Sequence, residues 1–470
     1  MQDIDAKSYS TAKVATRIGV HRDTLLRWLR GGKIPEPRRD RHGWRAFTEN
    51  EVQRIEQFAK LGPSEVTISG TSHRPAVGMK RLEALDWDFA DAKTGYLTHS
   101  LHPYPAKFIP QIPNTLIQEL SSVGERVADI FCGSGTTLVE ALTLKRNAVG
   151  IDASPLACLI SRAKTAVLTQ EERELLVSLA SRAEESAQSL VAEGQARLFP
   201  PVALSSQAPR PDSDAISFWF EPFIVQELAD ILSWCKALPT ESTRNVALTA
   251  FSSIIVAVSK QDSDTRYVRR SKDLHSGDAL RRFSRALADA VQAVWEFTEL
   301  VESRFSCSVY NADVLSAPDI GPVDLVVCSP PYPNAYSYHL YHMTRMLWLG
   351  MNQPWFKKVE IGSHRKYSSK SPKRATIETF RKEMSQILGW LRRHLRAGRF
   401  ACFVAGSSTI NGRKYSNTDV ISGAAQAQGF REISRIDRSM QDTKKAFNPA
   451  IGKIKQEQIL ILQNGGQTSS

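Results

Sequence analysis

Two short segments of this 470-residue chain carry side chains that could bind a ribose-containing ligand and act on a flat, polar substrate. The first is VADIFCGSGTTLVEAL, Val127–Leu142, in which two glycines separate an apolar strand pattern from a helix pattern. Glycines let a ligand approach the backbone, and the N-terminus of a helix favours an anionic group. About twenty residues later the pattern AVGID ends in Asp152, whose carboxylate could accept hydrogen bonds from both hydroxyls of a ribose.

The second segment is VVCSPPYPNAYSYH, Val326–His339, which joins a strand pattern to a rigid, aromatic loop. The run Val323–Cys328 is short and apolar, as strands buried in a parallel sheet are. Pro330 and Pro331 then fix their own φ angles and donate no backbone hydrogen bond. In a doubly wound sheet, a loop in this position faces the ligand bound at the strand ends.

The glycine spacing differs from that of the dinucleotide fingerprint, because no third glycine follows at the required place. The segment instead resembles the cofactor loop of the class I S-adenosylmethionine-dependent methyltransferases. The resemblance implies that S-adenosylmethionine is the cofactor and that its contacts include Asp129, Phe131, Gly133, Gly135, Thr136 and Asp152. It also implies that Asp313, in NADVL, contacts the adenine amino group, although a helix cap after a strand is the alternative for Asp313.

A third segment, SLHPYPAKFIPQIPNTLI at Ser100–Ile117, precedes the glycine loop. It resembles the segment with which base methyltransferases close over the methionine end of the cofactor. The match is carried by His102, Tyr104, Pro105, Lys107 and Phe108. The resemblance implies cofactor contacts from His102, Tyr104 and Lys107, with Lys107 available to neutralise the methionine carboxylate. A surface lysine beside a proline turn is the alternative.

The sequence Ser329-Pro330-Pro331-Tyr332 resembles the fourth motif of the methyltransferases that modify an exocyclic amino nitrogen of a DNA base. Such an amine is a poor nucleophile, because its lone pair is delocalised into the ring. Acceptors aimed at its N–H groups, here the Ser329 hydroxyl and the Pro330 carbonyl, would free that lone pair. The two prolines position these acceptors before the base arrives, and Tyr332 offers a face for stacking an extruded base. We therefore predict these four residues to be catalytic.

Serine at the first position of this motif is typical of the cytosine-N4 enzymes, whereas adenine-N6 enzymes mostly carry Asp or Asn. Ser329 therefore favours a site-specific DNA methyltransferase that produces N4-methylcytosine in restriction-modification or host-DNA protection. Adenine-N6 methylation is the first alternative, and methylation of a guanine amino group in RNA is another. No cysteine of the cytosine-C5 type follows the two prolines, so no covalent intermediate is expected. From a different class, the chain could be a DNA-binding transcriptional regulator with an inactive methyltransferase domain.

Strand and helix patterns alternate from residue 126 onward, as a doubly wound α/β sheet requires. We expect a class I methyltransferase domain over residues 81–463, with a helical insertion at 156–304, where the gap is too long for a simple crossover. The expected strands are Arg126–Ile130, Ala148–Ile151, Phe305–Val309, Val323–Cys328, Arg399–Ala405, Phe430–Arg435 and Ile459–Leu462.

Residues 1–60 form a separate unit in which a short helix, a turn at Gly19 and a basic second helix give a helix-turn-helix pattern. With the turn at His42-Gly43 that follows, the pattern resembles the winged DNA-binding head of MerR-type regulators. The expected DNA contacts are Arg22, Thr24, Arg27 and Arg30. A small helical docking domain is the alternative. A Gly-, Pro- and Ser-rich linker is expected at 61–80 and a tail at 464–470.

The net charge of +12 and the pI near 9.4 favour a polyanionic partner, which we take to be double-stranded DNA. Two basic segments could recognise the target, Gln261–Lys272 and Phe356–Thr376. A cognate restriction endonuclease is a candidate partner. The six cysteines are scattered and predict neither disulfides nor a zinc site. No membrane span or signal peptide is recognisable, so we expect a cytoplasmic protein with no membrane partner.

Overall fold

The computed structural model describes two units of the chain, which are treated separately below: residues 1–73 and residues 74–470. The described residues are 9–18, 25, 29, 37–39, 45–49, 51–53, 55–56, 75–89, 92–196, 208, 210–211, 214–316, 319–439 and 456–465. Within these ranges no helix is both long and apolar enough to cross a membrane.

The second unit is built on one mixed sheet in the strand order β12-β13-β10-β9-β4-β5-β8, with β11 paired to the outer part of β10. The neighbours from β8 to β10 are parallel, and β13 is antiparallel to both β10 and β12. The strands are β4 (Arg126–Asp129), β5 (Asn147–Asp152), β8 (Cys307–Asn311), β9 (Val323–Cys328), β10 (Leu395–Ile410), β11 (Arg413–Ser416), β12 (Phe430–Ser439) and β13 (Gln456–Asn464).

The order of the strands reverses between β4 and β9, because the chain moves outward through β5 and β8 on one side and through β10 on the other. Ligands bind at such switch points, beyond the carboxyl ends of the strands. The glycine loop follows β4 and the Ser-Pro-Pro-Tyr loop follows β9. The topology therefore brings together the two segments that the sequence singles out for chemistry.

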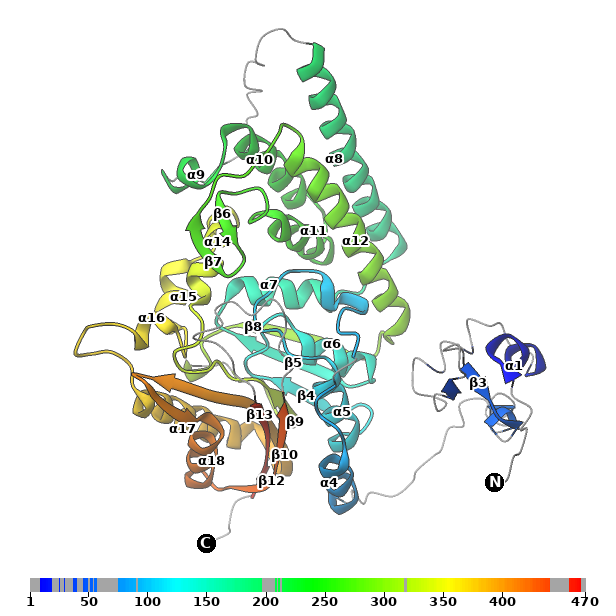
Figure 1. The fold of residues 1–470 in the computed structure, drawn as a ribbon, viewed down its shortest axis with the longest axis vertical. Helices are drawn as coiled ribbons and strands as arrows, with labels where there is room; N and C mark the ends of the chain where they lie inside the picture. The colour runs from blue at the N-terminus through cyan, green and yellow to red at the C-terminus, as the bar shows by residue number, and fades with distance from the viewer. Residues whose placement is uncertain are drawn as a thin grey trace, which may run out of the picture. The chain divides into compact units, whose positions relative to one another are not determined.

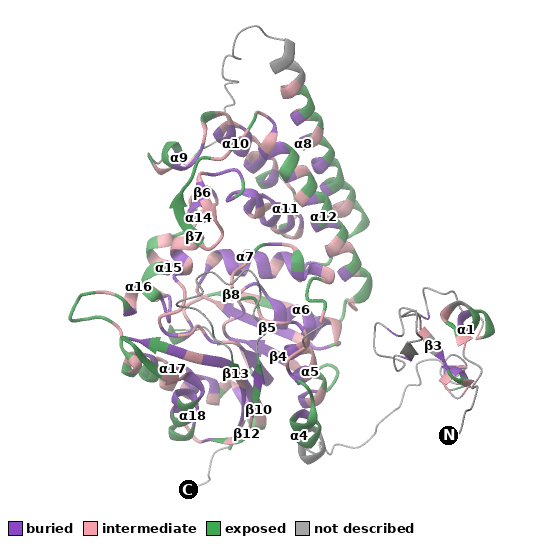
Figure 2. Ribbon diagram, viewed as in Figure 1, coloured by how far each residue is buried: buried purple, intermediate pink, exposed green. Residues whose placement is uncertain are grey.

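Helices cover both faces of the sheet (Figure 1). One apolar layer joins the sheet to helices later in the chain, and the other joins it to helices that precede or follow β4. The first set is α17 (Ile377–His394) and α18 (Asn417–Ala427), and the second is α4 (Pro75–Ala84), α5 (Gln111–Leu120) and α6 (Thr136–Thr143). Figure 2 shows the sheet buried between them. The predicted fold class, a doubly wound α/β sheet, is confirmed.

A helical layer with its own core lies beside the sheet (Figure 1). It consists of α7 (Pro155–Lys164), which packs on β5 and β8, followed by α8 (Gln170–Ala196), α9 (Asp214–Trp219), α10 (Pro222–Lys236), α11 (Glu241–Ile254) and α12 (Asp278–Leu300). A hairpin of β6 (Gln261–Ser263) and β7 (Arg266–Arg269) interrupts it. Its core includes Trp348, which makes edge-to-face contacts with Phe220 and Phe251.

Trp348 belongs to a run of short helices that follows the Ser-Pro-Pro-Tyr loop: α13 (Tyr338–Tyr341), α14 (Met343–Trp348), α15 (Gln353–Val359) and α16 (His364–Tyr367). Because Trp348 is buried in the helical core, this run ties the loop after β9 to the helical layer. The layer is therefore positioned by the same stretch of chain that forms one wall of the predicted site.

In the first unit a three-stranded sheet, β1-β3-β2, packs with α1 (Thr11–Arg17). Its strands are β1 (Tyr9–Ser10), β2 (Arg38–Arg39) and β3 (Arg45–Phe47), and its core comprises Val14, Ala15, Leu25, Leu29, Phe47, Val52 and Ile55. Leu25 and Leu29 are four residues apart, as one face of a helix requires. The four predicted DNA contacts, Arg22, Thr24, Arg27 and Arg30, lie outside the described residues.

The structure corrects some predicted boundaries. The last six residues of the predicted linker, 75–80, belong to α4, where Met79 and Leu82 are buried against the sheet-covering layer. Strand β13 continues to Asn464, the first residue of the predicted tail. The hairpin β6–β7 and strand β11 were not predicted. Their strands are only three or four residues long, and the side chains of β7 are all exposed, so no alternation of apolar and polar residues marks them.

Candidate active site

A cavity of about 320 Å³ opens at the carboxyl ends of β4, β5 and β9. Twelve of the fourteen predicted catalytic and cofactor residues line it: Tyr104, Lys107, Asp129, Phe131, Gly133, Thr136, Asp152, Asp313, Ser329, Pro330, Pro331 and Tyr332. This volume falls in the range of ordinary small-molecule sites. The glycine loop and the aromatic loop therefore face one shared space.

The glycine loop adopts a conformation that other residues would disturb. Gly133 and Gly135 have φ angles of 50° and 79°, in the left-handed region. A Cβ atom on Gly135 would also lie 3.0 Å from the Cα atom of Ser161 in α7. Gly135 thus lets the loop pack on α7 and does not itself line the cavity.

Asp152 connects the end of β5 to the glycine loop. Its carboxylate accepts hydrogen bonds from the backbone N–H of Gly133 at 2.9 Å and from that of Ser154 at 2.8 Å. Asp129, at the end of β4, accepts in the same way from the N–H of Phe131 at 3.0 Å. A buried carboxylate, Asp129, and a half-buried one, Asp152, therefore border the cavity and are held by neutral backbone donors.

Burial changes the acidity of both groups, because a charged carboxylate is poorly solvated there. Desolvation raises the pKa of Asp129 to about 7, with hydrogen bonds from Thr137 and Phe131 opposing the rise. Desolvation likewise raises the pKa of Asp152 to about 6, against the N–H groups of Ser154 and Gly133. A positively charged ligand would stabilise the ionised form of both carboxylates and so lower their pKa values.

Two of the three predicted cofactor residues in the segment before the glycine loop line the cavity. Tyr104 lines the cavity and stacks on Tyr338, with ring centroids 5.7 Å apart. Lys107 also lines it and donates to the carbonyl of His99 at 3.1 Å. A second lysine, the fully buried Lys164 of α7, lies within 3.4 Å of the same carbonyl and of the Ser134 hydroxyl. Sequence reasoning missed Lys164, which looks like an ordinary helix surface residue.

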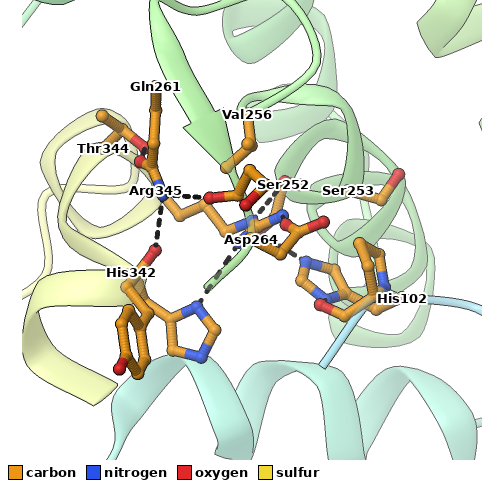
Figure 3. Close-up of polar contacts among 12 residues, drawn as sticks. His102, Ser252, Ser253, Val256, Gln261, Asp264, His342, Thr344 and Arg345 are labelled. Atoms are coloured by element: carbon orange, nitrogen blue, oxygen red, sulfur yellow. Dashed lines mark hydrogen bonds and ion pairs between the residues drawn. The ribbon is translucent and has the colours of Figure 1, made fainter. Parts of the chain in front are cut away.

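His102, a predicted cofactor residue, does not line the cavity. Its ring is fully buried and contacts the hydroxyl of Ser252, in α11, at 3.0 Å (Figure 3). The other ring nitrogen contacts the carbonyl of Pro103 at 2.9 Å. His102 therefore joins Ser100–Ile117, the lid segment, to the helical layer.

The Ser-Pro-Pro-Tyr loop is held from two sides. The Tyr332 hydroxyl donates to Glu457 of β13 at 2.8 Å, and Glu457 forms an ion pair with Arg438 of β12 at 2.6 Å. On the other side Gly362 packs so closely that an added Cβ would lie 2.8 Å from the Tyr332 carbonyl oxygen. The loop is thus fixed in position by groups far away in the sequence.

Three charged residues of the cavity wall were not predicted: Glu360, Arg438 and Glu457. Glu360 is buried and accepts hydrogen bonds from the Tyr338 N–H, at 2.6 Å, and from the His339 ring, at 2.5 Å. Arg438 and Glu457 lie in unremarkable sequence contexts, whereas Glu360 lies within the basic segment Phe356–Thr376. Arg438 and Glu457 are directly opposite one another on antiparallel strands, a pairing that only the register reveals.

Asp313 caps a short helix and also lines the cavity. One carboxylate oxygen accepts from the N–H of Leu315 at 3.0 Å, which caps the short helix η2 (Val314–Ser316). The same side chain is half-buried and lines the cavity. The cap therefore orients the carboxylate at the edge of the cavity.

Within the described ranges, no group of three or more His, Cys, Asp or Glu side chains could hold a metal ion. The chain's cysteines are all free thiols.

Two regions of the chain match models of known families. Residues 69–162 match the DNA methylase family model, and residues 9–70 match that of the MerR HTH family regulatory proteins. The first match contains the lid segment, the glycine loop and Asp152, whereas the Ser-Pro-Pro-Tyr loop lies outside it.

Curated relatives include two type II methyltransferases. M.MjaII of Methanocaldococcus jannaschii is 35% identical over 112 residues, 23% of this chain and 21% of that protein. M.MvaI of Kocuria varians is 29% identical over 174 residues, 36% of each chain. The chain thus spans between about a fifth and a third of the length of these relatives.

Among solved structures, the rRNA methyltransferase aviRa of Streptomyces viridochromogenes covers 82% of this chain and 95% of its own, with a TM-score of 0.31 at 10% identity. The chain thus joins a region similar to DNA methylases to a region similar to MerR-type helix-turn-helix regulators.

Proposed function

We propose that the protein transfers a methyl group from S-adenosylmethionine to the exocyclic N4 of cytosine in double-stranded DNA. The observation that carries this proposal is the shared cavity, with the glycine loop and its carboxylates on one wall and Ser329 to Tyr332 on the other. A cofactor wall and a base wall that face one space are what a direct transfer between two ligands requires. The match of residues 69–162 to DNA methylases supports DNA as the substrate.

The residues of the cofactor wall fit S-adenosylmethionine by their charge. When bound, this cofactor supplies an electrophilic methyl group on a positively charged sulfur. Within the described residues, the half-buried Asp152 and the buried Asp129 accept hydrogen bonds without a cationic donor, and Asp313 adds a third carboxylate at the cavity edge. Lys107, on the lid segment, offers the opposite charge for the methionine carboxylate.

This arrangement predicts that cofactor affinity depends on pH. With pKa values of about 6 for Asp152 and about 7 for Asp129, both carboxyls are mostly protonated at pH 5 and mostly ionised near pH 8. A cationic ligand favours ionisation, so affinity should rise with pH across this interval and binding should release protons. Calorimetric titration in two buffers of different ionisation enthalpy measures that release. Constant affinity from pH 5 to 8 would contradict the assigned roles.

On the base wall, the chain's own groups are positioned before any substrate arrives. The Ser329 hydroxyl interacts with the Tyr332 hydroxyl, which is itself fixed by Glu457. Ser329 and the Pro330 carbonyl would accept hydrogen bonds from the amino group of the extruded base, while the Tyr332 ring stacks on it. No group of this wall needs to form a covalent bond to the base.

Serine at position 329 is the feature that favours cytosine over adenine. The decisive experiment incubates the protein with unmethylated bacterial DNA and labelled S-adenosylmethionine, then digests the DNA to nucleosides for mass spectrometry. N4-methylcytosine is the expected product. N6-methyladenine would select the first alternative, and S-adenosylmethionine binding without any methylated nucleoside would favour a regulator with an inactive domain.

The MerR-like head would add DNA affinity to this activity. We propose that residues 1–60 hold the enzyme on DNA and so raise the local concentration of target at the catalytic unit. A variant lacking residues 1–73 should methylate the same sequence but need roughly ten-fold more DNA for half-maximal rate, with a weaker salt dependence. Unchanged kinetics, with footprinting of the full chain at a single promoter, would favour a regulatory use of the head.

We further propose that the protein acts in the cytoplasm, where its DNA substrate is, and that its methylation protects host DNA. A restriction endonuclease that cleaves the same unmethylated sequence is the partner that such protection implies.

A further inference from the structure

The β6–β7 hairpin forms a two-stranded sheet of its own, separate from the main sheet (Figure 1). Its two strands are antiparallel, with Gln261 opposite Arg269 and Ser263 opposite Arg266. All four side chains of β7 are exposed, and the exposed fraction is 37% for Tyr267 and 58% for Val268. An isolated two-stranded hairpin is at best marginally stable, so an exposed and basic one needs an anchor.

A buried polar network supplies that anchor (Figure 3). Arg345, in α14, is fully buried and forms an ion pair with Asp264, in the turn of the hairpin. Its guanidinium also donates to the Ser252 carbonyl at 2.9 Å. Next to it Thr344 donates to the buried Gln261 side chain at 2.9 Å. Both the first residue and the turn of the hairpin are thus fixed to the helix that follows the base wall.

The network extends from the hairpin to the cavity. Arg345 also donates to the ring of His342 at 3.4 Å, and that ring stacks on Tyr104, with centroids 5.1 Å apart. Tyr104 lines the cavity. A rigid chain of contacts therefore sets the distance between the turn of the hairpin and the lid side of the site.

A second path runs through aromatic rings. Tyr338 and Tyr336 line the cavity and lie 5.6 Å apart, and Tyr341 lies 6.1 Å from Tyr336. Tyr267 of the hairpin continues the row, 6.2 Å from Tyr341. Such a row of rings leads from the enclosed cavity to the exposed strand β7.

The hairpin also contacts the second basic segment of the sequence, Phe356–Thr376. Arg365, in α16, donates to the Tyr267 hydroxyl at 2.8 Å and lies over its ring at 5.8 Å. Arg269, on the same side of β7 as Tyr267, lies over the exposed Phe218 ring at 4.8 Å. The two segments that the sequence marks as candidates for target recognition therefore form one surface.

The surface keeps positive charge after its internal ion pairs are counted. Asp262 pairs with Arg266 and Arg270, at 3.3 and 3.5 Å, and Asp264 pairs with Arg345. The contacts of Arg269 and Arg365 described above are with rings and a hydroxyl, which leave their charge uncompensated. Arginine in this setting suits phosphate oxygens, which it can bind with two parallel hydrogen bonds.

We infer that Tyr267, Arg269 and Arg365 form a docking surface for the DNA backbone beside the base that enters the cavity. This inference rests on the proposed function, because it assigns the DNA contact of the same catalytic site. Phosphate contacts of this kind fix register and orientation on the duplex, and the anchored hairpin would hold the flanking strand while the base is extruded.

The test replaces both arginines in the full chain, as R269Q/R365Q. We expect the affinity for a target duplex at about 0.15 M salt to fall at least ten-fold, with a salt slope lower in magnitude by about two. The affinity for S-adenosylmethionine and the melting temperature should remain unchanged. The matched control is R182Q/R285Q, which removes two exposed arginines from α8 and α12 and should change DNA affinity by less than about two-fold.

A second measurement locates the contact. A photoreactive group on Val268→Cys should cross-link to nucleotides flanking the target base, whereas one on Arg285→Cys should not. Wild-type affinity and salt slope in R269Q/R365Q, or an equal loss in the control, would overturn the docking surface. Preference of the surface for duplex RNA would overturn DNA as its partner.

Methylation by the wild-type protein distinguishes a failure of the docking surface from a failure of the proposed activity. If it methylates DNA while R269Q/R365Q binds normally, only the docking surface is wrong. If the wild-type protein methylates no DNA and R269Q/R365Q nevertheless loses DNA affinity, the docking surface stands and the proposed activity is wrong.

Discussion

Replacing Tyr332 by alanine should lower the rate of DNA methylation by about a hundred-fold while the affinity for S-adenosylmethionine stays within about two-fold. Stacking of a base on an aromatic ring contributes about 1–3 kcal/mol, and that contribution disappears with the ring. The variant also loses the hydrogen bond to Glu457, so the loop that carries Ser329 is no longer fixed on that side. Methyl transfer from labelled cofactor and calorimetric titration measure the two quantities.

The variant Tyr332→Phe separates the ring from its anchor. It keeps the stacking face and loses only the hydroxyl bonded to Glu457, so its rate should fall less than that of Tyr332→Ala. The partly buried Tyr332 ring packs against the apolar layer between the sheet and the helices α17 and α18. A melting curve must therefore accompany both variants. A large loss of cofactor affinity in a well-folded Tyr332→Ala variant would move Tyr332 to the cofactor wall and contradict its assignment to the base.

Much of this site was predictable because its parts follow strands directly. The glycine loop after β4, the acid at the end of β5 and the rigid loop after β9 each have a local signal, and parallel strands bring their carboxyl ends together. The same logic failed for Glu457 and Arg438, since their roles depend on the register of two antiparallel strands near the end of the chain. Nothing in either local sequence specifies that register.

Proximity in sequence was also a poor guide to the surroundings of His102. His102 lies two residues before Tyr104, yet the two side chains go to different environments: Tyr104 to the cavity and His102 to Ser252 in the helical layer. The prediction treated the lid segment as a strip that faces the cofactor. It could not include the helical layer, because that layer is formed by an insertion whose position on the sheet has no local signal. The β6–β7 hairpin was missed for the related reason that Arg345, the residue that anchors it, is some eighty positions away.

Asp152 should be the most sensitive residue of the cofactor wall. Replacing it by alanine removes an acceptor for the ribose and also leaves the N–H groups of Gly133 and Ser154 without their present partner. An unsatisfied buried donor costs about 1–3 kcal/mol, so the combined effect should lower the affinity for S-adenosylmethionine by about a hundred-fold. DNA affinity should change less than about two-fold, because Asp152 is assigned to the cofactor and not to the docking surface for DNA.

Two comparisons make this expectation specific to the site. Asp152→Asn keeps the size of the side chain and one carbonyl acceptor, so it should give an intermediate affinity and lose the part of the pH dependence that belongs to Asp152. Asp319→Ala removes an exposed carboxylate that also accepts from a backbone N–H, that of Gly321, but lies outside the cavity. It should leave cofactor affinity unchanged. Parallel loss of cofactor and DNA affinity in Asp152→Ala would show that the carboxylate supports the fold of the loop rather than the ligand, and the ribose assignment would then be wrong.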